Sequence, residues 1–286
     1  EGIFTSGGTD SALLLALNKN INKKINTFTF NYKEKKFSEI NEARSLAKEC
    51  NFNNYNAILP NKELLNYYFK VIEIQQEPIS SLRVVSHHHL YEYFKDRAKV
   101  IFEGSGGDEI SAGYRYQILG WYLDMIKNSN SKKVNKEFAH YLSAYKNKEK
   151  YLNGSFNRLF GLGGSTSDGS IYFDKNFFNK DFQNNLKSNF EILRPFKSHI
   201  RNSQYADLYY FKLPRSLRYA DRAAMRYGIE TRLPFLDHKL VENCFQMPTK
   251  HKFVNRQQRY LFKNNIKKKI KNYIFENKRS IADPQQ

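Results

Sequence analysis

The sequence has 286 residues, of which 40% are hydrophobic and 26% are charged, a balance that fits a folded protein with a sizeable core and excludes general disorder. Lysine and arginine together number 47 against 28 aspartates and glutamates, which gives a formal net charge of +19. Because the lysines are spread along the chain and cluster strongly only at 267–271, this charge favours a solvated basic surface over a nucleic-acid-binding face.

Strand and helix patterns alternate over the first third of the chain. Short apolar or aromatic runs predict strands, and apolar positions at helical spacing predict the helices between them. Strands are expected at 3–5, 26–31, 55–59 and 99–102, and helices at 10–17, 37–50 and 86–94. Such alternation is typical of an α/β fold with a doubly wound parallel sheet. From about Trp121 the strand patterns fade, so we expect an α/β core over residues 1–125 and a mainly helical part over residues 126–286.

A glycine-rich motif lies between the first strand and the first helix. It reads Ser6-Gly7-Gly8-Thr9-Asp10-Ser11. The two glycines allow a tight turn and a close approach of ligand to backbone, while the amides at the helix start and the two serine hydroxyls form an anion site. Asp10 is placed to hold a metal ion against phosphates. A helix cap after a glycine turn is the alternative, but the framing by strand and helix favours a phosphate-binding loop.

A second glycine-rich motif follows the fourth strand. It reads Glu103-Gly104-Ser105-Gly106-Gly107-Asp108-Glu109. Because open parallel sheets bind ligands at the carboxyl ends of their strands, we expect this loop to face the first motif. Carboxylate oxygens are the ligands that Mg²⁺ takes in proteins, so Asp10 and Asp108 are predicted to share a magnesium ion. A glycine turn before a helix with an acidic start is the structural alternative.

A third motif lies in the C-terminal half. It begins Leu213-Pro214-Arg215, continues through Asp221-Arg222-Ala223-Ala224-Met225 and ends Glu230-Thr231-Arg232-Leu233-Pro234-Phe235-Leu236-Asp237-His238. With the first two motifs and Glu77-Pro78, it resembles the signature of the C-terminal synthetase domain of glutamine-dependent asparagine synthetases, in the ATP pyrophosphatase-loop superfamily. The motifs span nearly the whole chain. The charged residues of 221–232 are expected in one helical stretch, either as scaffold or in contact with substrate.

The resemblance implies a Rossmann-like fold of the adenine-nucleotide α-hydrolase type and an AMP-forming carbon–nitrogen ligase of asparagine biosynthesis. In such an enzyme the aspartate side-chain carboxylate attacks the α-phosphate of ATP, and ammonia then displaces AMP to form asparagine. ATP and Mg²⁺ are the implied cofactors, with Asp10 and Asp108 as metal ligands. The residues implied in binding ATP or pyrophosphate are Phe4, Ser6, Gly7, Gly8, Asp10, Ser11, Phe30, Glu103 and Gly104, with Phe30 against the adenine.

Three residues are assigned to catalysis by the resemblance, namely Asp108, Ser105 and Lys278. Lys278 lies in a segment that resembles the one holding the family's catalytic lysine, where it would stabilise negative charge; an ordinary surface lysine is the alternative. Ser105 departs from the family pattern, which usually has Glu or Asp at this position, and serine keeps a hydrogen-bonding group but loses the charge. An acceptor carboxylate other than aspartate is therefore an alternative, and so is a non-catalytic binding module. The net charge of +19 leaves open a third alternative, an RNA-modifying enzyme with the same ATP loop.

The resemblance also implies an N-terminal glutaminase domain, whose cysteine nucleophile releases ammonia from glutamine. Cys50 and Cys244 do not fit that role and are predicted to be buried. Because the chain also begins in the middle of a strand pattern, we expect a fragment that lacks the glutaminase domain. Its expected partners are that domain, ATP, aspartate and ammonia or glutamine, with a homodimer left open. Short apolar runs and the lack of a disulfide framework predict a cytoplasmic protein that does not enter a membrane.

Two further patterns are not assigned to the site. Residues 161–170 are rich in glycine and serine but no strand or helix start frames them, so a surface linker is predicted rather than a phosphate loop. Residues 87–89 are three consecutive histidines. Because consecutive helix positions point in different directions, they are not expected to bind one metal ion.

Overall fold

A computed structural model describes residues 1–19, 21, 25–31, 38–79, 82–129, 132–143, 147–160, 179–181, 192–254, 257–270 and 273. The chain forms two compact units. The first, here called the sheet unit, comprises residues 1–111 and 213–286, and the second, called the helical unit, comprises residues 112–212. Lys278 and the glycine-rich stretch 161–170 lie outside the described residues. Among the residues that are described, no helix has the length and apolar character needed to cross a membrane.

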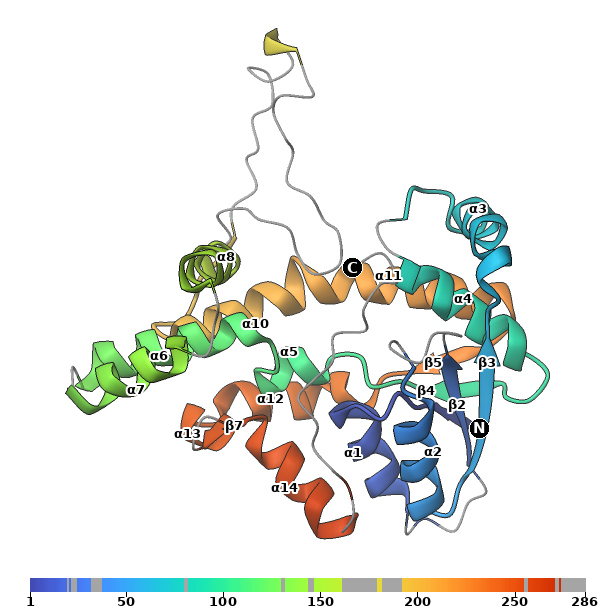
Figure 1. The fold of residues 1–286 in the computed structure, drawn as a ribbon, viewed down its shortest axis with the longest axis horizontal. Coiled ribbons are helices and arrows are strands. Elements are labelled where there is room, and N and C mark those ends of the chain that lie inside the picture. The colour runs from blue at the N-terminus through green and yellow to red at the C-terminus, as the bar shows by residue number, and fades with distance from the viewer. Residues whose placement is uncertain are drawn as a thin grey trace. The chain divides into compact units, whose positions relative to one another are not determined.

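The sheet consists of five parallel strands in the order β3-β2-β1-β4-β5 (Figure 1). They are β1 (Gly2–Phe4), β2 (Asn26–Asn31), β3 (Asn53–Ile58), β4 (Val100–Phe102) and β5 (Glu230–Arg232). The chain winds from β1 through β2 to β3 and then crosses back to β4 on the other side of β1. β1 and β4 are therefore neighbours where the strand order reverses, which is where open parallel sheets bind ligands. The predicted α/β fold with a parallel sheet is confirmed.

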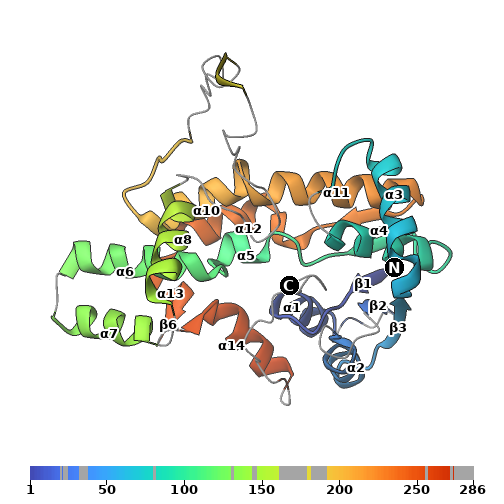
Figure 2. The ribbon, with the colours of Figure 1, turned by 45° about the horizontal axis from the view of Figure 1, so that its top comes forward.

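Helices cover both faces of this sheet. The helices of the sheet unit are α1 (Thr9–Asn18), α2 (Ile40–Glu49), α3 (Leu64–Gln75), α4 (Leu82–Phe94), α5 (Gly107–Ser111), α11 (Lys212–Arg226), α12 (His238–Gln246), α13 (Thr249–Lys252) and α14 (Tyr260–Lys269). Two 3₁₀ turns (Asn61–Glu63 and Pro234–Leu236) and an antiparallel pair, β6 (Phe253–Val254) with β7 (Gln257–Gln258), accompany them. Figures 1 and 2 show α1 and α2 on one side of the sheet and α4 and α11 on the other.

A hydrophobic cluster fills the space between the sheet and α4. Phe28 of β2 is fully buried and stacks on Phe94 of α4, with 4.3 Å between the ring centroids. Tyr91 of α4 and Ile101 of β4 belong to the same cluster, and Phe4 at the end of β1 lies 4.8 Å from Tyr91 between ring centroids. Burial of each large apolar side chain contributes about 1.5–3 kcal/mol. This packing holds the carboxyl ends of β1 and β4 beside α4.

The fifth strand is not predicted by the sequence pattern. The expectation that residues 221–232 form one helical stretch is wrong, because α11 ends at Arg226 and Glu230–Arg232 forms β5. The three residues of β5 are Glu, Thr and Arg, which carry no apolar alternation. The strand instead depends on parallel pairing with β4, in which Thr231 lies opposite Ile101. One edge of the sheet is therefore supplied by the C-terminal half of the chain.

The helical unit contains four described helices, α6 (Arg115–Ser129), α7 (Lys132–Ser143), α8 (Lys148–Phe160) and α10 (His199–Tyr209). Asp124 of α6 connects that helix to the start of α10. Its carboxylate accepts hydrogen bonds from Ser198 Oγ at 2.6 Å and from the backbone amide of His199 at 2.7 Å. A negative charge is favoured at this end of a helix by the helix dipole.

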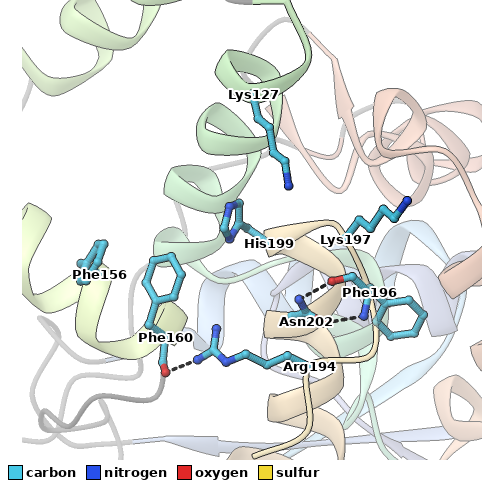
Figure 3. A pocket seen from close by; sticks show the side chains of 8 residues that line it. All are labelled: Lys127, Phe156, Phe160, Arg194, Phe196, Lys197, His199 and Asn202. Carbon is cyan, nitrogen blue, oxygen red and sulfur yellow. Dashed lines mark hydrogen bonds between the residues drawn. The ribbon is translucent and has the colours of Figure 1, made fainter.

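The surface of the helical unit has a hollow of about 550 Å³ (Figure 3). Arg194 donates a hydrogen bond to the carbonyl oxygen of Phe160, and the His199 ring lies edge-on to the Phe160 ring at 5.4 Å between centroids. The lining residues are Lys127, Phe156, Phe160, Arg194, Phe196, Lys197, His199 and Asn202. None of them belongs to the sequence motifs, so the residues with predicted chemistry are found elsewhere, at the sheet.

Candidate active site

The first glycine-rich loop connects the end of β1 to the start of α1. Ser11 Oγ accepts a hydrogen bond from the amide of Ser6 at 3.3 Å and donates one to the carbonyl oxygen of Gly8 at 3.1 Å. Ser6 Oγ accepts a hydrogen bond from the amide of Gly8 at 3.3 Å. The hydroxyl of Tyr273 donates to the carbonyl oxygen of Gly7 at 2.5 Å. These bonds hold the loop in place at the N-terminus of α1, where backbone amides and the helix dipole favour an anion.

The second glycine-rich loop connects β4 to α5 and contacts α1. A Cβ atom at Gly104 would lie 2.6 Å from the Cβ of Asp10, and a Cβ at Gly107 would lie 1.9 Å from Asp10 Oδ1. Only glycine leaves room for such a close approach. The structure therefore brings Asp10, Gly104 and Asp108 together at the carboxyl ends of two neighbouring strands, β1 and β4.

Arg259, the residue just before α14, joins the two loops. Its side chain is 5% exposed, and its Nη1 donates to Asp10 Oδ2 at 3.1 Å and to Asp108 Oδ1 at 2.8 Å. Its Nη2 donates to Asp10 Oδ1, and its Nε donates to Ser111 Oγ at 2.9 Å. The planar guanidinium suits such bidentate contacts with carboxylates. A single buried side chain thus ties together the first loop, α5 and the turn before α14.

This ion-pair cluster bears directly on the predicted magnesium site. Carboxylate oxygens suit Mg²⁺, but both oxygens of Asp10 and Oδ1 of Asp108 accept hydrogen bonds from Arg259. A positive charge already lies between the two negative ones. Across the described residues, no group of three or more His, Cys, Asp or Glu side chains is arranged to hold a metal ion. The pair does not present an open magnesium site in this arrangement, and a shared Mg²⁺ stays a prediction.

Glu103, the first residue after β4, is only 3% exposed. Its Oε1 accepts a hydrogen bond from the Tyr91 hydroxyl, and its Oε2 accepts one from Ser105 Oγ at 3.4 Å. The Tyr91 hydroxyl also lies 3.0 Å from Thr231 Oγ1 on β5. Burial raises the pKa of Glu103, and the two hydroxyls and the charge of Arg83 offset this only in part. Ser105 therefore has a buried carboxylate of raised pKa beside it.

Phe4 and Phe30 lie at the carboxyl ends of β1 and β2. The Phe4 ring packs on Tyr91, and the Phe30 ring lies edge-on to His89 of α4 at 6.0 Å between centroids. Both phenylalanines are partly buried, so each packs against the core and keeps some exposed surface. Contact of either ring with a nucleotide stays a prediction.

Charged residues of two motifs meet beyond the end of α3. Glu77 Oε1 lies 3.1 Å from Arg218 Nη2 and 3.5 Å from Arg222 Nη1 on α11. Arg222 also donates a hydrogen bond to the carbonyl oxygen of Gln75, the last residue of α3. These contacts hold the end of α3 to α11. They support the interpretation of Arg222 as scaffold.

Several residues that make contacts in the site carry no clear signal in the sequence. Arg259 is one of 47 basic residues, and Tyr91 is one of 20 tyrosines, so residue type does not distinguish them. Their burial beside a carboxylate distinguishes them, and that feature is visible only in the structure. Lys278 lies outside the described residues, so its catalytic role remains a prediction.

Known proteins resemble this chain along almost its whole length. It matches a family model described as asparagine synthase over residues 2–284. It is 22% identical over 291 residues to glutamine-hydrolyzing asparagine synthetase 1 of Bacillus subtilis (strain 168), covering 97% of this chain and 45% of the relative. For asparagine synthetase 2 of the same organism the identity is 28%, with 84% of this chain and 30% of the relative covered. For a putative asparagine synthetase of Mycobacterium tuberculosis (strain H37Rv) these values are 22%, 91% and 41%. The chain spans less than half the length of these relatives.

Proposed function

The chain belongs to the asparagine synthase family, and on this premise we propose that it is the synthetase part of an ATP-dependent, AMP-forming amide ligase. The contact between the two glycine-rich loops carries the proposal. Asp10 occupies the space that Gly104 and Gly107 leave open, at the N-terminus of α1 and at the point where the strand order reverses. Both features suit the phosphates of a nucleotide.

In this proposal the phosphates of ATP lie against the first loop, whose members Ser6, Gly7, Gly8 and Ser11 supply amides and hydroxyls. The adenine lies against Phe30, with Gly104 at the nucleotide backbone. Because the Glu103 side chain is buried, this residue meets the nucleotide through its main chain. Mg²⁺ neutralises phosphate charge when it is bound with ATP. The buried guanidinium of Arg259 supplies a positive charge of the protein's own between Asp10 and Asp108.

The proposed reaction has two steps. An oxygen of the acceptor carboxylate attacks the α-phosphorus of ATP, the bond to pyrophosphate breaks, and an acyl adenylate forms. Ammonia then attacks the carbonyl carbon, AMP leaves, and the nitrogen loses a proton to give the amide. The protein orients the reactants and neutralises charge on the transferring group, the second being the task proposed for Lys278. A glutaminase domain outside this chain is the proposed ammonia source.

Aspartate is the first acceptor to test, because the names of the relatives are those of asparagine synthetases. Ser105 is the reason to test others, since it lacks the carboxylate that the family carries at this position. A different carboxylate acceptor is accordingly the alternative. An RNA substrate is favoured only by the net charge of +19, and it predicts tRNA binding that weakens steeply with salt.

ATP–pyrophosphate exchange tests the proposal. The purified protein is given ATP, Mg²⁺, labelled pyrophosphate and one carboxylate at a time, beginning with aspartate. Label entering ATP only with a particular carboxylate supports adenylation and identifies the acceptor. Asp10→Asn keeps the side-chain size but removes a carboxylate that holds Arg259 against the first loop, so exchange should fall by about 10²-fold, while circular dichroism should still show a folded protein of lower stability. Exchange that is absent with every carboxylate, or undiminished in Asp10→Asn, contradicts the proposal.

A further inference from the structure

The carboxylate that position 105 lacks has a counterpart two residues earlier. Glu103 Oε2 accepts a hydrogen bond from Ser105 Oγ at 3.4 Å. Glu103 is 3% exposed, whereas Ser105 is only partly buried. Glu103 therefore cannot touch a substrate itself, but the hydroxyl of Ser105 connects it to the loop surface. Such catalytic hydrogen bonds are often long before substrate binds.

The ionisable side chain of Glu103 lies among groups from three parts of the sheet unit. The groups that face it come from its own loop, from α4 and from β5, and they are Ser105, Tyr91, Arg83 and, through the Tyr91 hydroxyl, Thr231. Asp221 of α11 also acts on Tyr91 by its charge. Glutamine would fill the same space without the cost of burying a charge. Burial raises the pKa of Glu103, which makes its carboxylate a stronger base than an exposed one.

We propose that Glu103 receives the proton released in the amide-forming step, acting through the hydroxyl of Ser105. Glu103 is thus a positioning residue, and Ser105 is the group that meets the reactants. This inference rests on the proposed function, and it explains how the chain forms an amide without a carboxylate at position 105. The Tyr91 hydroxyl orients the carboxylate by donating to its other oxygen.

The amide-forming step moves one proton from the attacking nitrogen to Glu103. The nitrogen of ammonia bonds to the carbonyl carbon of the acyl adenylate, and the bond from that carbon to the AMP oxygen breaks. The positively charged nitrogen gives a proton to Ser105 Oγ while the hydroxyl proton of Ser105 moves to Glu103 Oε2. The products are a neutral amide, AMP and a protonated Glu103, which returns its proton to solvent when the products leave.

Two substitutions test this relay with both half-reactions measured. Glu103→Gln keeps the shape and removes the base, and Ser105→Ala removes the relaying hydroxyl. Each should lower amide formation from free ammonia by about 10²- to 10⁴-fold, at least ten times more than it lowers ATP–pyrophosphate exchange. Ser105→Thr retains a hydroxyl and should keep more amide formation than Ser105→Ala. Thr231→Val is the matched control, because it removes the contact with the Tyr91 hydroxyl but no hydrogen bond made by Glu103 or Ser105, and it should show no selective loss of amide formation.

The pH profile gives a second readout that packing alone would not move. With the concentration of free ammonia held constant, amide formation should rise with pH as Glu103 ionises. Tyr91→Phe removes a hydrogen bond that lowers the pKa of Glu103, so the rising limb should shift to higher pH. In Glu103→Gln this limb should vanish.

The outcomes separate this inference from the proposed function. If the wild-type protein shows no exchange with any carboxylate, both fail together. If exchange is present but Glu103→Gln and Ser105→Ala lower both half-reactions equally, or neither, the relay alone is overturned. An unmoved pH limb in Tyr91→Phe overturns it as well. Circular dichroism and thermal melting identify a variant that has failed to fold, and Ser105→Ala, at a partly buried position, keeps the test decisive in that case.

Discussion

Arg259 connects residues that are far apart in sequence. It is 249 positions from Asp10 and 151 positions from Asp108, yet it donates hydrogen bonds to both. The three side chains are all largely buried, with exposures of 5%, 23% and 13% for Arg259, Asp10 and Asp108. At this depth, charges are screened weakly by solvent. Removing one partner of such a buried pair is therefore far more damaging than losing a surface ion pair.

Arg259→Met should expose this dependence in two measurements. The two carboxylates would face each other without a counter-charge, so the free energy of unfolding should fall by about 3–5 kcal/mol. Freed of the guanidinium, they should also gain affinity for a divalent cation. We expect millimolar Mg²⁺ without nucleotide to raise the melting temperature of Arg259→Met and to leave that of the wild-type protein unchanged.

Arg232→Met is the matched control for this prediction. Arg232 pairs with Glu230 at 3.4 Å, but the two side chains are 64% and 50% exposed. Its loss should change stability by less than about 1 kcal/mol and should create no response to Mg²⁺. A magnesium response in the wild-type protein would instead mean that Asp10 and Asp108 already form an open metal site.

At the scale of elements, the site depends on how closely α1 and the loop after β4 approach each other. α1 follows β1 through the first glycine-rich loop, the second loop directly follows β4, and β1 and β4 are hydrogen-bonded neighbours. The absence of a Cβ atom at Gly104 allows Asp10 to lie against that loop. A displacement of about 1 Å in such a site can lower a rate by about 10²-fold.

Gly104→Ala should therefore separate the two loops. The new methyl group would lie 2.6 Å from the Cβ of Asp10, so one of the loops has to move. We expect ATP–pyrophosphate exchange to fall by roughly 10- to 100-fold, with a loss of stability of about 1–3 kcal/mol. Gly154→Ala on α8 is the control, because nothing lies within 4 Å of its added Cβ. It should leave exchange intact and stabilise the helix by roughly 0.5–1 kcal/mol. Equal effects of the two substitutions would argue against a close contact at Gly104.

At the scale of the whole molecule, the chain lacks a reactive thiol in the part that the structure describes. Cys50 and Cys244, its only cysteines, are both buried. Burial raises the pKa of the Cys50 thiol to about 11 and also raises the pKa of Cys244. Because the thiolate is the nucleophile, neither cysteine suits glutamine hydrolysis at neutral pH.

The purified 286 residues should therefore use free ammonia and not glutamine. Amide formation should rise with ammonium chloride and stay at background with glutamine, as measured by AMP release and product analysis. Glutamate release is the direct check on hydrolysis. Glutamate formed from glutamine by this chain, and abolished in Cys50→Ser or Cys244→Ser, would overturn the prediction.

Much of the α/β architecture follows from local patterns. The aromatic and β-branched run at Asn26–Asn31 predicts β2 with the bounds found in the structure, because such residues are enriched in strands. β5 does not follow from a local pattern, because Glu230–Arg232 has no apolar alternation and forms a strand only by pairing with β4. A charged three-residue edge strand depends on its neighbour for hydrogen bonds, and that neighbour is remote in sequence.

For the site, the sequence by itself determined the two glycine-rich loops, their position after β1 and β4, and the family. These follow from contiguous motifs, since a turn that admits a phosphate needs glycine and small hydroxyl residues in one short stretch. Only the tertiary structure decided that Arg259 lies between Asp10 and Asp108 and that Glu103 is buried beside Tyr91 and Ser105. The physical reason is that Arg259 and Tyr91 belong to other elements than the carboxylates that they contact. The strength of such contacts depends on burial, and burial is determined only when the whole chain is packed.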